Sequence, residues 1–256
     1  MAVYNYPFPS YTWPYKGIDF AYLSGISAQL AEDMVADGIS FVGRYLYSSQ
    51  YPNGKGISRQ EAEFYLNAGL AIFLYYEVNA GDALGGYNAG VANGQNAHAL
   101  AIDLGVPQGT PIICCCDTSV TDQQASGVVL QYLEGFTSEI LGYNSGIYGG
   151  LNVVEACYNA HPGLWRVQAG AWGSQEFSDI DVRQWYIPRN IDAQNDGYVS
   201  ISNVTIDANG YASWRGHSVD LISAPSLQYM WNGQPAPQPK SKMPIWFYLK
   251  KNRGIF

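Results

Sequence analysis

One short run of sequence limits the possible folds of this chain more than any other. Six apolar residues, from Pro111 to Cys116, follow a Gly-Thr turn and lead directly into Asp117. A strand that is apolar at every position must be covered on both faces, as in parallel sheets. A carboxylate at the C-terminal end of such a strand is how barrels present a catalytic residue. In the alternative interpretation, Asp117 only caps the next turn, helped by Thr118 and Ser119.

The same order of elements, a capped helix followed by an apolar strand, recurs along the chain. Ser27 and Ser58 are N-caps of predicted helices, Gly38 and Gly69 follow these helices as C-terminal glycines, and Thr121 caps a later helix. Strands are predicted at 17–22, 39–46, 70–76, 111–116, 145–149, 164–172, 180–185 and 218–222. About eight alternating units within 256 residues favour a single α/β domain, a closed (β/α)8 TIM-type barrel with a parallel sheet.

Two features interrupt or flank this alternation. Between 186 and 216, the turns Asn195-Asp196-Gly197 and Asp207-Ala208-Asn209-Gly210 predict an inserted β-hairpin before the last strand. Residues 1–16 are predicted to form an extended arm rich in aromatic residues and proline, and 233–256 a proline-rich linker and tail, which leaves 17–232 for the barrel. Each arm packs either on the chain's own barrel or against a partner.

Composition argues against two classes of partner. With a net charge of −8 and only 13 Lys and Arg residues, the chain has no basic stripe for phosphates, so nucleic acid is not an expected partner. No stretch approaches the ~20 apolar residues of a membrane span. The four cysteines are too few for a disulfide framework and are interpreted as core thiols. The N-terminus lacks the regions of a secretory signal, which predicts synthesis in a host cytoplasm.

An ordered set of short motifs, between about residues 17 and 222, resembles a known family. The motifs are Gly17-Ile18-Asp19, Phe41-Val42-Gly43-Arg44-Tyr45, Glu61-Ala62, Ala68-Gly69-Leu70, Glu77, Leu104-Gly105-Val106-Pro107, Asp117, Gly146-Ile147-Tyr148-Gly149, Ala171-Trp172 and Asp181-Val182-Arg183-Gln184-Trp185. In this order they are similar to the glycoside-hydrolase-like barrel domains of actinobacteria and phages, a family of unknown function distantly similar to family 25 lysozymes. The resemblance implies a (β/α)8-type barrel with a pocket for cell-wall sugar.

One position departs from the lysozyme pattern. The family 25 lysozymes carry Asp-x-Glu at the end of the fourth strand, whereas this chain has Asp117-Thr118-Ser119. The second carboxylate is missing here, and with it the simplest catalytic assignment.

Four acids follow or lie in predicted strands and are expected to converge at one end of the barrel. They are Asp19, Glu77, Asp117 and Asp220. Glycoside hydrolysis needs one protonated and one ionised carboxyl group, and like charges held close together raise one another's pKa. The preferred assignment is Glu77 as the acid, Asp117 as nucleophile or electrostatic stabiliser, and Asp19 as the residue that orients substrate or water. Alternatively, the acids form an unreactive ring held by Arg44, Arg183 and hydroxyl groups.

The remaining candidate residues are expected to contact substrate. These substrate-binding candidates are Arg44, Tyr76, Tyr148, Trp172, Trp185 and Asp220. Aromatic rings stack on sugars, although a ring in such a strand is more often part of the core, and a strand arginine more often pairs with a carboxylate. None of the three histidines stands at metal-ligand spacing from Cys or Asp, and no phosphate-binding glycine loop is present, so neither a metal nor a cofactor is predicted.

The resemblance, together with the missing signal sequence, predicts a phage-encoded, cell-wall-directed protein of the virion, tail or lysis apparatus. It is expected to hydrolyse or bind cell-wall glycan through the acid cluster, in the virion or at the bacterial cell wall. The alternative function is that of a non-catalytic structural or glycan-binding virion protein on a degenerate hydrolase barrel. The aromatic arms are expected to bind another chain, either a virion protein or a second copy.

Overall fold

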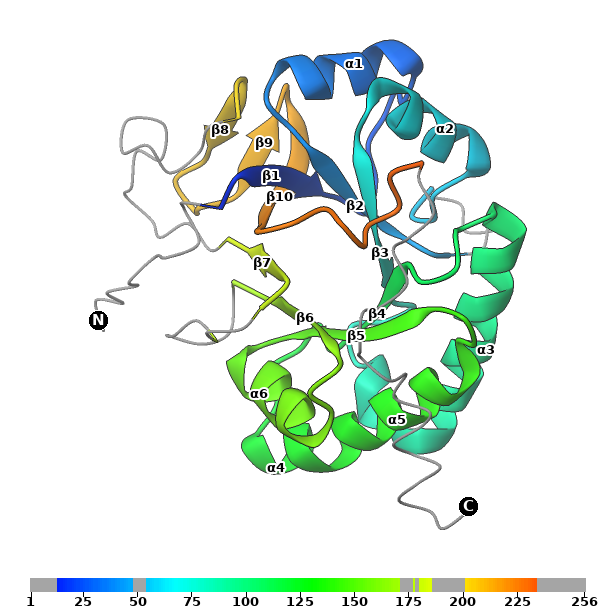
Figure 1. Cartoon of the computed structure of the whole chain (residues 1–256). Coiled ribbons are helices and arrows are strands. Elements are labelled where there is room, and N and C mark those ends of the chain that lie inside the picture. Colours follow the sequence, from blue (N-terminus) through cyan, green and yellow to red (C-terminus); the bar gives the residue numbers. More distant parts are fainter. Residues whose placement is uncertain (1–12, 48–53, 171–176, 178–179, 186–200, 234–256) are drawn as a thin grey trace.

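The structure is a computed structural model that describes residues 13–47, 54–170, 177, 180–185 and 201–233. Within these residues the chain forms a closed eight-stranded barrel with helices on its outside (Figure 1). The predicted barrel fold is therefore confirmed. Most of both predicted arms, Trp172 and the turn at 195–197 lie outside the described residues. Among the helices of the described part, none combines the length and apolar character needed to cross a membrane.

The barrel consists of strands β1 to β7 and β10, hydrogen-bonded in this order and closed by the pairing of β10 with β1. Their bounds are Tyr15–Asp19 (β1), Phe41–Tyr45 (β2), Ala71–Tyr76 (β3), Pro111–Cys115 (β4), Asn144–Gly149 (β5), Trp165–Gln168 (β6), Val182–Gln184 (β7) and His217–Ala224 (β10). Strands β1 to β7 are all parallel to their neighbours in the sequence order.

The last barrel strand runs against the others, so the predicted all-parallel sheet is wrong at this point. β10 is antiparallel to both β7 and β1. The predicted hairpin is present as β8 (Val204–Ile206) and β9 (Ala212–Trp214), and β9 also pairs with β10 across a turn at Arg215 and Gly216. Both turn residues have positive φ, as tight hairpin turns require. The chain thus enters β10 through a hairpin, whereas a parallel strand would have needed a crossover connection.

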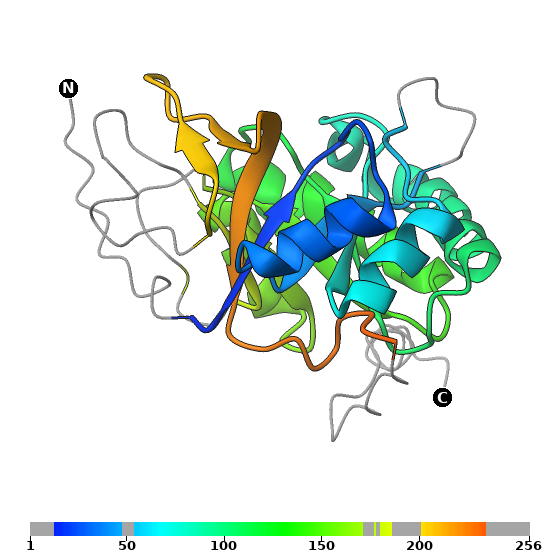
Figure 2. The same ribbon diagram turned by 90° about the horizontal axis from the view of Figure 1, so that it is seen from above.

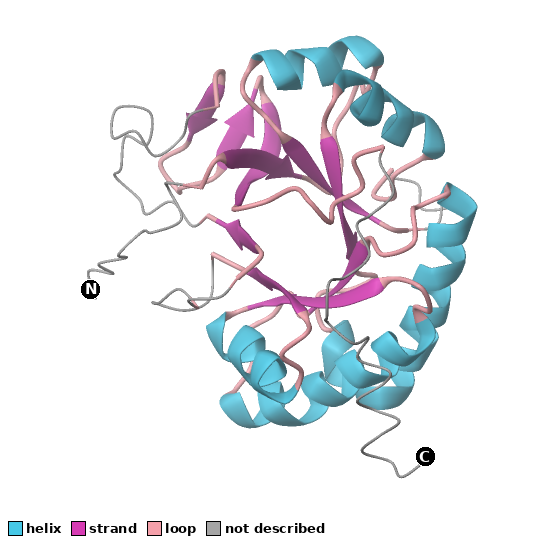
Figure 3. Cartoon of the chain, in the orientation of Figure 1, coloured by secondary structure: helices cyan, strands magenta, loops and turns pink. Residues whose placement is uncertain are grey.

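Helices follow each of the first five strands, and predicted caps set where three of them begin. The bounds are Ala28–Ala36 (α1), Arg59–Ala68 (α2), Gly86–Leu104 (α3), Asp122–Gln124 (α4), Leu130–Glu139 (α5) and Leu151–Ala160 (α6); a 3-10 turn, Asp82–Gly85, precedes α3, and a π-helical segment, Ala125–Val129, joins α4 to α5. The side chains of Ser27, Ser58 and Thr121 each accept a hydrogen bond from the backbone N–H three residues later. In the described part of the chain no helix follows β6 or β7, so the predicted alternation is incomplete there (Figure 3).

Helices α3 and α5 pack closely because glycines face each other across their contact. A Cβ atom at Gly90 would overlap the backbone of Tyr132, and one at Gly135 would overlap the backbone of Tyr87. The close packing of α3 against α5 therefore depends on glycine at these positions.

Successive strand residues alternate between two apolar layers. Inside the barrel, Phe41, Phe73, Ile113 and Trp165 belong to one buried cluster. A larger cluster fills the space between the strands and the surrounding helices. All four cysteines are buried and unpaired, with Cys115 in the inner layer and the others in the outer one.

The segment that follows β10 closes the end of the barrel where the parallel strands begin. Trp231 and Ile72 exchange two backbone hydrogen bonds, of 3.0 and 2.7 Å. Met230 is buried in the inner cluster, and the ring centroid of Tyr229 lies 5.7 Å from that of Trp165. Figure 2 shows this segment crossing the lower edge of the barrel. The opposite end, called the mouth below, is where the parallel strands finish.

Candidate active site

The candidate site lies at the mouth, where β1, β3 and β4 end. Asp19 is the last residue of β1, Glu77 follows β3 directly, and Asp117 follows β4 after one intervening residue. Glu77 and Asp117 each stand two positions after an inner-layer residue, Tyr75 and Cys115 respectively. Because strand side chains alternate with a period of two, the acids continue the inward rows of their strands.

Asp220 joins these acids from β10. Because β10 is antiparallel, its first half lies at the mouth, and Asp220 stands directly opposite Asp19. Although the side chain of Asp220 is exposed to the solvent of the mouth, the protein atoms around it partly desolvate the carboxyl group and raise its pKa. The structure therefore brings all four predicted acids to one end of the barrel.

Asp19 is the most deeply buried of the four, with 2% of its surface exposed. Burial raises the pKa of Asp19 well above its usual value, and the charges of Asp220 and Asp117 raise it further. Hydrogen bonds from Tyr75 and Gln184 act in the opposite direction. The Tyr75 hydroxyl donates to Oδ2 of Asp19 over 3.4 Å. Asp19 therefore favours its protonated form more strongly than an exposed aspartate does.

Asp117 and Glu77 are neighbours whose surroundings differ. Burial raises the pKa of Asp117 to about 6, and the charges of Glu77 and Asp220 contribute to the rise, while a hydrogen bond from Tyr148 and the charge of Lys55 lower it. The Nζ atom of Lys55 lies 2.9 Å from Oε1 of Glu77. At this distance the two side chains form an ion pair. The site thus holds one carboxyl that readily takes up a proton beside one that is paired with a lysine.

Three tyrosines line the barrel beside these acids. The ring centroids of Tyr45 and Tyr75 are 5.4 Å apart, and those of Tyr75 and Tyr148 are 5.8 Å apart. The Tyr148 hydroxyl donates to Oε1 of Gln184 over 2.8 Å. Burial, followed by the charges of nearby carboxylates, raises the pKa of all three hydroxyls well above 10. They are neutral groups that offer hydrogen bonds and ring faces.

Tyr76 and Trp185 do not lie with the acids, contrary to their prediction as substrate-binding residues. Both occupy outward positions, one residue away from an inward one. The ring centroid of Tyr76 is 5.7 Å from that of Phe136 on α5. The indole N–H of Trp185 donates to the buried hydroxyl of Ser223, over 2.8 Å, on the outer face of β10.

Arg44 also lies outside the barrel interior. It is completely buried, and its Nε donates to Oε1 of Glu61 on α2 over 2.6 Å. This is the carboxylate pairing of the alternative interpretation, and it corrects the expectation that Arg44 binds substrate. Trp172, the remaining aromatic candidate, falls outside the described residues.

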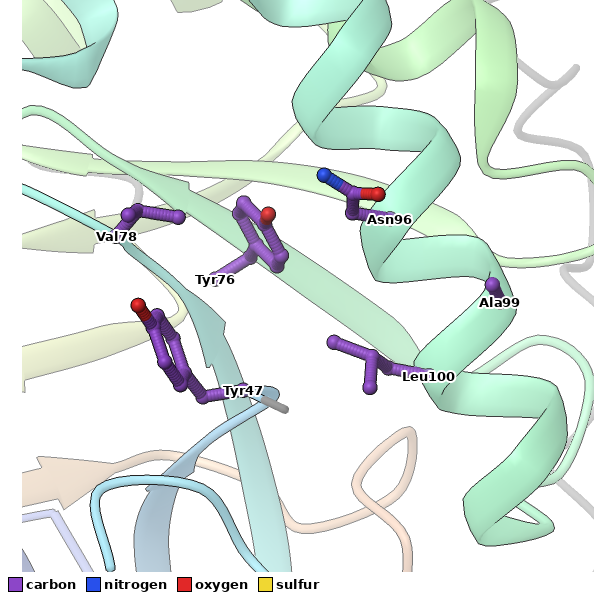
Figure 4. A pocket seen from close by; sticks show the side chains of 6 residues that line it. All are labelled: Tyr47, Tyr76, Val78, Asn96, Ala99 and Leu100. Atoms are coloured by element: carbon purple, nitrogen blue, oxygen red, sulfur yellow. The ribbon is translucent and has the colours of Figure 1, made fainter. Parts of the chain in front are cut away.

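A cavity of about 340 Å³ lies between β3 and α3, on the side of the strand that faces the helices (Figure 4). It is lined by Tyr47, Tyr76, Val78, Asn96, Ala99 and Leu100. Tyr76 and Val78 flank Glu77 in the sequence, and they face this cavity while Glu77 faces the mouth. β3 therefore separates the cavity from the acids, and the candidate site does not include it.

Four residues of the site were not identified from the sequence. They are Tyr45, Lys55, Tyr75 and Gln184. Tyr75 precedes Glu77 by two positions, so strict alternation would have identified it. Lys55 reaches Glu77 from the loop after β2, and nothing in the sequence pattern distinguishes it from the other lysines. Within the described residues, no three His, Cys, Asp or Glu side chains are grouped so that they could hold a metal ion.

Comparison with known proteins adds to this description. Residues 32–212 match the family described as the Rv2525c-like, glycoside hydrolase-like domain. No curated protein sequence matches the chain significantly. Among solved structures, the Tat-secreted protein Rv2525c of Mycobacterium tuberculosis, in complex with L-tartrate, is 21% identical with a TM-score of 0.63, over 85% of this chain and 99% of that one.

Two further structures are more distant. An uncharacterized protein of B. stearothermophilus is 16% identical with a TM-score of 0.56, over 85% of this chain and 100% of that one. The spore cortex lytic enzyme SleM of Clostridium perfringens is 14% identical with a TM-score of 0.47, over 82% of this chain and 67% of that one. At these identities, the likeness to Rv2525c and to the B. stearothermophilus protein, with TM-scores above 0.5, shows a shared fold alone.

Proposed function

The chain belongs to the Rv2525c-like, glycoside hydrolase-like domain family, and from this premise we propose that its barrel mouth binds a glycan and hydrolyses a glycosidic bond. One observation carries the proposal. Asp117 and Glu77 are neighbouring carboxyl groups with different surroundings: burial raises the pKa of Asp117 to about 6, whereas Glu77 is paired with the ammonium of Lys55. Glycosidases use such a pair, with one group as the acid and the other as nucleophile or base.

In the proposed reaction, Asp117 is the acid. With a pKa of about 6, a fraction of its carboxyl groups is protonated near neutral pH. The proton passes to the oxygen of the leaving sugar as the bond from that oxygen to the anomeric carbon breaks. This reverses the assignment made from the sequence, in which Glu77 was the acid, because the raised pKa belongs to Asp117 and Glu77 is paired with Lys55.

Glu77 has two possible tasks, and both use its negative charge. It either attacks the anomeric carbon to form a covalent intermediate, which water then hydrolyses, or removes a proton from the water that attacks directly. Asp19, Asp220 and Tyr148 are proposed to hydrogen-bond the substrate or the water. The ring faces of Tyr45 and Tyr148 provide apolar surface against which a sugar ring packs.

We propose bacterial cell-wall glycan as the substrate, on the basis of the motif resemblance and the family. The predicted phage origin and virion or lysis role stay predictions, as does the binding of protein partners by the arms at 1–16 and 233–256. Light scattering after separate deletion of 1–16 and 240–256 tests the arms: a barrel that stays folded but loses association supports them as docking segments, and unfolding contradicts that role.

Binding without hydrolysis is the second candidate function, and one sequence feature favours it. Ser119 stands where the family 25 lysozymes carry the second acid of the strand. A mouth that lost that acid can still bind sugar through the remaining carboxyl and hydroxyl groups.

The two functions are separated by the release of soluble fragments from isolated actinobacterial cell walls. Wild type is expected to release fragments, and Glu77→Gln and Asp117→Asn are each expected to reduce the rate by at least ~100-fold while wall binding persists. The matched control is Asp103→Asn, because Asp103 is an exposed acid on α3, outside the barrel mouth. If wild type releases nothing but binds walls, the binding function replaces hydrolysis. If it neither binds nor hydrolyses, the cell-wall substrate is wrong.

A further inference from the structure

Arg44 forms more than a simple ion pair, because all three nitrogen atoms of its guanidinium group donate hydrogen bonds. Besides the contact of Nε with Glu61, Nη2 donates to Oε2 of Glu61 over 3.3 Å. Nη1 and Nη2 also donate to four backbone carbonyl oxygens. A single arginine with no exposed surface thus reaches six acceptor atoms with five N–H groups, because Nη1 has three acceptors for its two hydrogens.

The four carbonyl groups belong to two loops at the mouth. Phe20 and Ala21 follow β1, and they accept from Nη1 over 2.6 and 3.3 Å. Gly54 and Lys55 come from the loop after β2, and they accept from Nη2 and Nη1 over 3.3 and 3.1 Å. Arg44 therefore ties the loop that leaves Asp19 to the loop that carries Lys55.

Lys55 is held on both sides along its backbone. Its carbonyl accepts from Arg44, and the next residue, Gly56, forms a bridge with Tyr45 of β2. Its side chain then crosses the face of the Tyr45 ring, with Nζ 4.6 Å from the centroid, and ends 2.9 Å from Glu77. The lysine side chain thus bridges the distance between this tethered backbone and Glu77.

The anchor of this arrangement is Glu61 on α2. It lies 2.6 Å from Arg44, and it also accepts a hydrogen bond from the hydroxyl of Tyr65 over 2.9 Å. Glu61 therefore balances the buried charge of Arg44 and fixes the plane of the guanidinium. Through Arg44, Glu61 connects the two loops to α2.

Resting on the proposed function, we propose that Arg44 is a positioning residue of the active site, which acts through the backbone of Lys55 to hold the lysine ammonium against Glu77. Arg44 touches neither substrate nor the reacting carboxyls. Lysine in its place would keep the positive charge beside Glu61, but a single ammonium with three donors cannot reach both loops.

The test follows the protonation of Asp117, because that group senses Lys55 whether or not the protein is an enzyme. The other ionisable groups around Asp117 and Glu77, within the described residues, are Asp19, Tyr45, Cys115, Cys116, Tyr148 and Asp220. Since Lys55 lowers the pKa of Asp117, Lys55→Met should raise the titration midpoint of Asp117 by roughly a few tenths of a pH unit, measured by carbon-13 NMR of the side-chain carboxyl.

Arg44→Lys is expected to raise the same midpoint, and to add nothing further in the Lys55→Met background. Glu61→Gln is a second variant, for use if Arg44→Lys fails to fold, because it removes the charge of Glu61 and keeps its shape. It should raise the Asp117 midpoint by less than Arg44→Lys does, and it should cause no further rise in the Lys55→Met background. The proposal is overturned if the folded variants melt at lower temperature while the Asp117 midpoint is unchanged, or if the shifts in the two backgrounds are equal. Because no step of this measurement needs hydrolysis, a missing enzyme activity would refute the proposed function without deciding the role of Arg44.

Discussion

The two ends of the barrel interior are filled by the same alternation of strand residues, but with opposite chemistry. At the closed end, Phe73, Trp165 and Met230 pack in one apolar cluster, each with no more than 7% of its surface exposed. At the mouth, four positions after Phe73 on β3 and after Ile113 on β4, the inward row continues as the carboxyl groups of Glu77 and Asp117. Removal from water is favourable in free energy for the apolar side chains of the closed end and unfavourable for the carboxyl groups of the mouth.

The closed end therefore stabilises the barrel, whereas the mouth holds its ionisable groups. Apolar burial at the closed end stabilises the fold by roughly 25 cal/mol per Å² removed from water. At the mouth, burial raises the pKa of Asp19 and Asp117, so the folded chain holds these carboxyls against their preference for charge. Apolar burial at the closed end must therefore offset the unfavourable free energy of burying carboxyl groups at the mouth.

The largest loss of stability is expected from a substitution at the closed end. Phe73 is 1% exposed, and its ring centroid lies 5.1 Å from that of Tyr75 and 6.3 Å from that of Trp165. Phe73→Ala should lower the free energy of unfolding by about 3–5 kcal/mol, because it removes a fully buried ring and leaves a cavity. Urea denaturation followed by circular dichroism measures the loss.

The matched control stands on the same strand, two positions nearer the mouth. Tyr75→Phe keeps the ring and removes only the hydroxyl that reaches Asp19 over 3.4 Å, so a change of about 1 kcal/mol is expected. Equal losses in the two variants would mean that the closed end is not the main source of stability.

A smaller effect should appear when the pH is changed. The folded-state pKa of Asp117 is about 6, against an ordinary value of 3.8, so the folded state binds this proton more tightly than the unfolded state does. Stability should therefore rise as the pH falls from about 6 to 4, be complete below about 4, and be lost again as the pH rises through 6. The contribution is on the order of 1–3 kcal/mol.

Asp117→Asn should flatten this part of the stability curve, as measured by thermal unfolding at a series of pH values. Asp37 changes stability with pH in the opposite direction and in a different pH range. Its pKa is lowered by hydrogen bonds from Arg215, Asn203 and Trp214, so its contribution is lost only as the pH falls below about 4. A wild-type curve that is flat between pH 4 and 6 would contradict the raised pKa of Asp117.

The smallest effect is expected from Tyr148→Phe. The hydroxyl of Tyr148 shares its one hydrogen between Gln184 and Asp117, and its hydrogen bond to Asp117 lowers the pKa of that group. Its loss should raise the Asp117 midpoint by a few tenths of a pH unit and change stability by about 1 kcal/mol or less. Carbon-13 NMR of the Asp117 carboxyl measures the shift, and a fall in the midpoint would contradict the hydrogen bond.

Much of the fold could be predicted because local chemistry determined it. Ser27, Ser58 and Thr121 cap helices in the structure as they were expected to, since a side-chain acceptor three residues before an N–H is a local feature. The direction of β10 was not predicted. The apolar pattern of β10 fits a parallel or an antiparallel strand equally well. Only the observed pairing with β7 and β1 shows that the strand is antiparallel.

The candidate site was predicted in part, and the errors have one physical cause. Arg44, Tyr76 and Trp185 each stand next to an inward residue but point outward themselves, since a shift of one position reverses the face of a strand. Their inward neighbours, Tyr45, Tyr75 or Glu77, and Gln184, line the mouth. Lys55 could not be predicted, because its place depends on how a loop folds back through contacts with Arg44 that are distant in sequence.

The reversed direction of β10 has a consequence for how such a protein can be mounted on a surface. In an all-parallel barrel the eighth strand would deliver the chain to the rim around the acids. Here Ala224, at the end of β10, pairs with Tyr15 at the start of β1, and Trp231 then pairs with Ile72 near the start of β3. A linker or immobilisation tag joined after Gly233 would therefore pull on the closed end, and an anchored molecule would present its acids away from the support and toward incoming polymer.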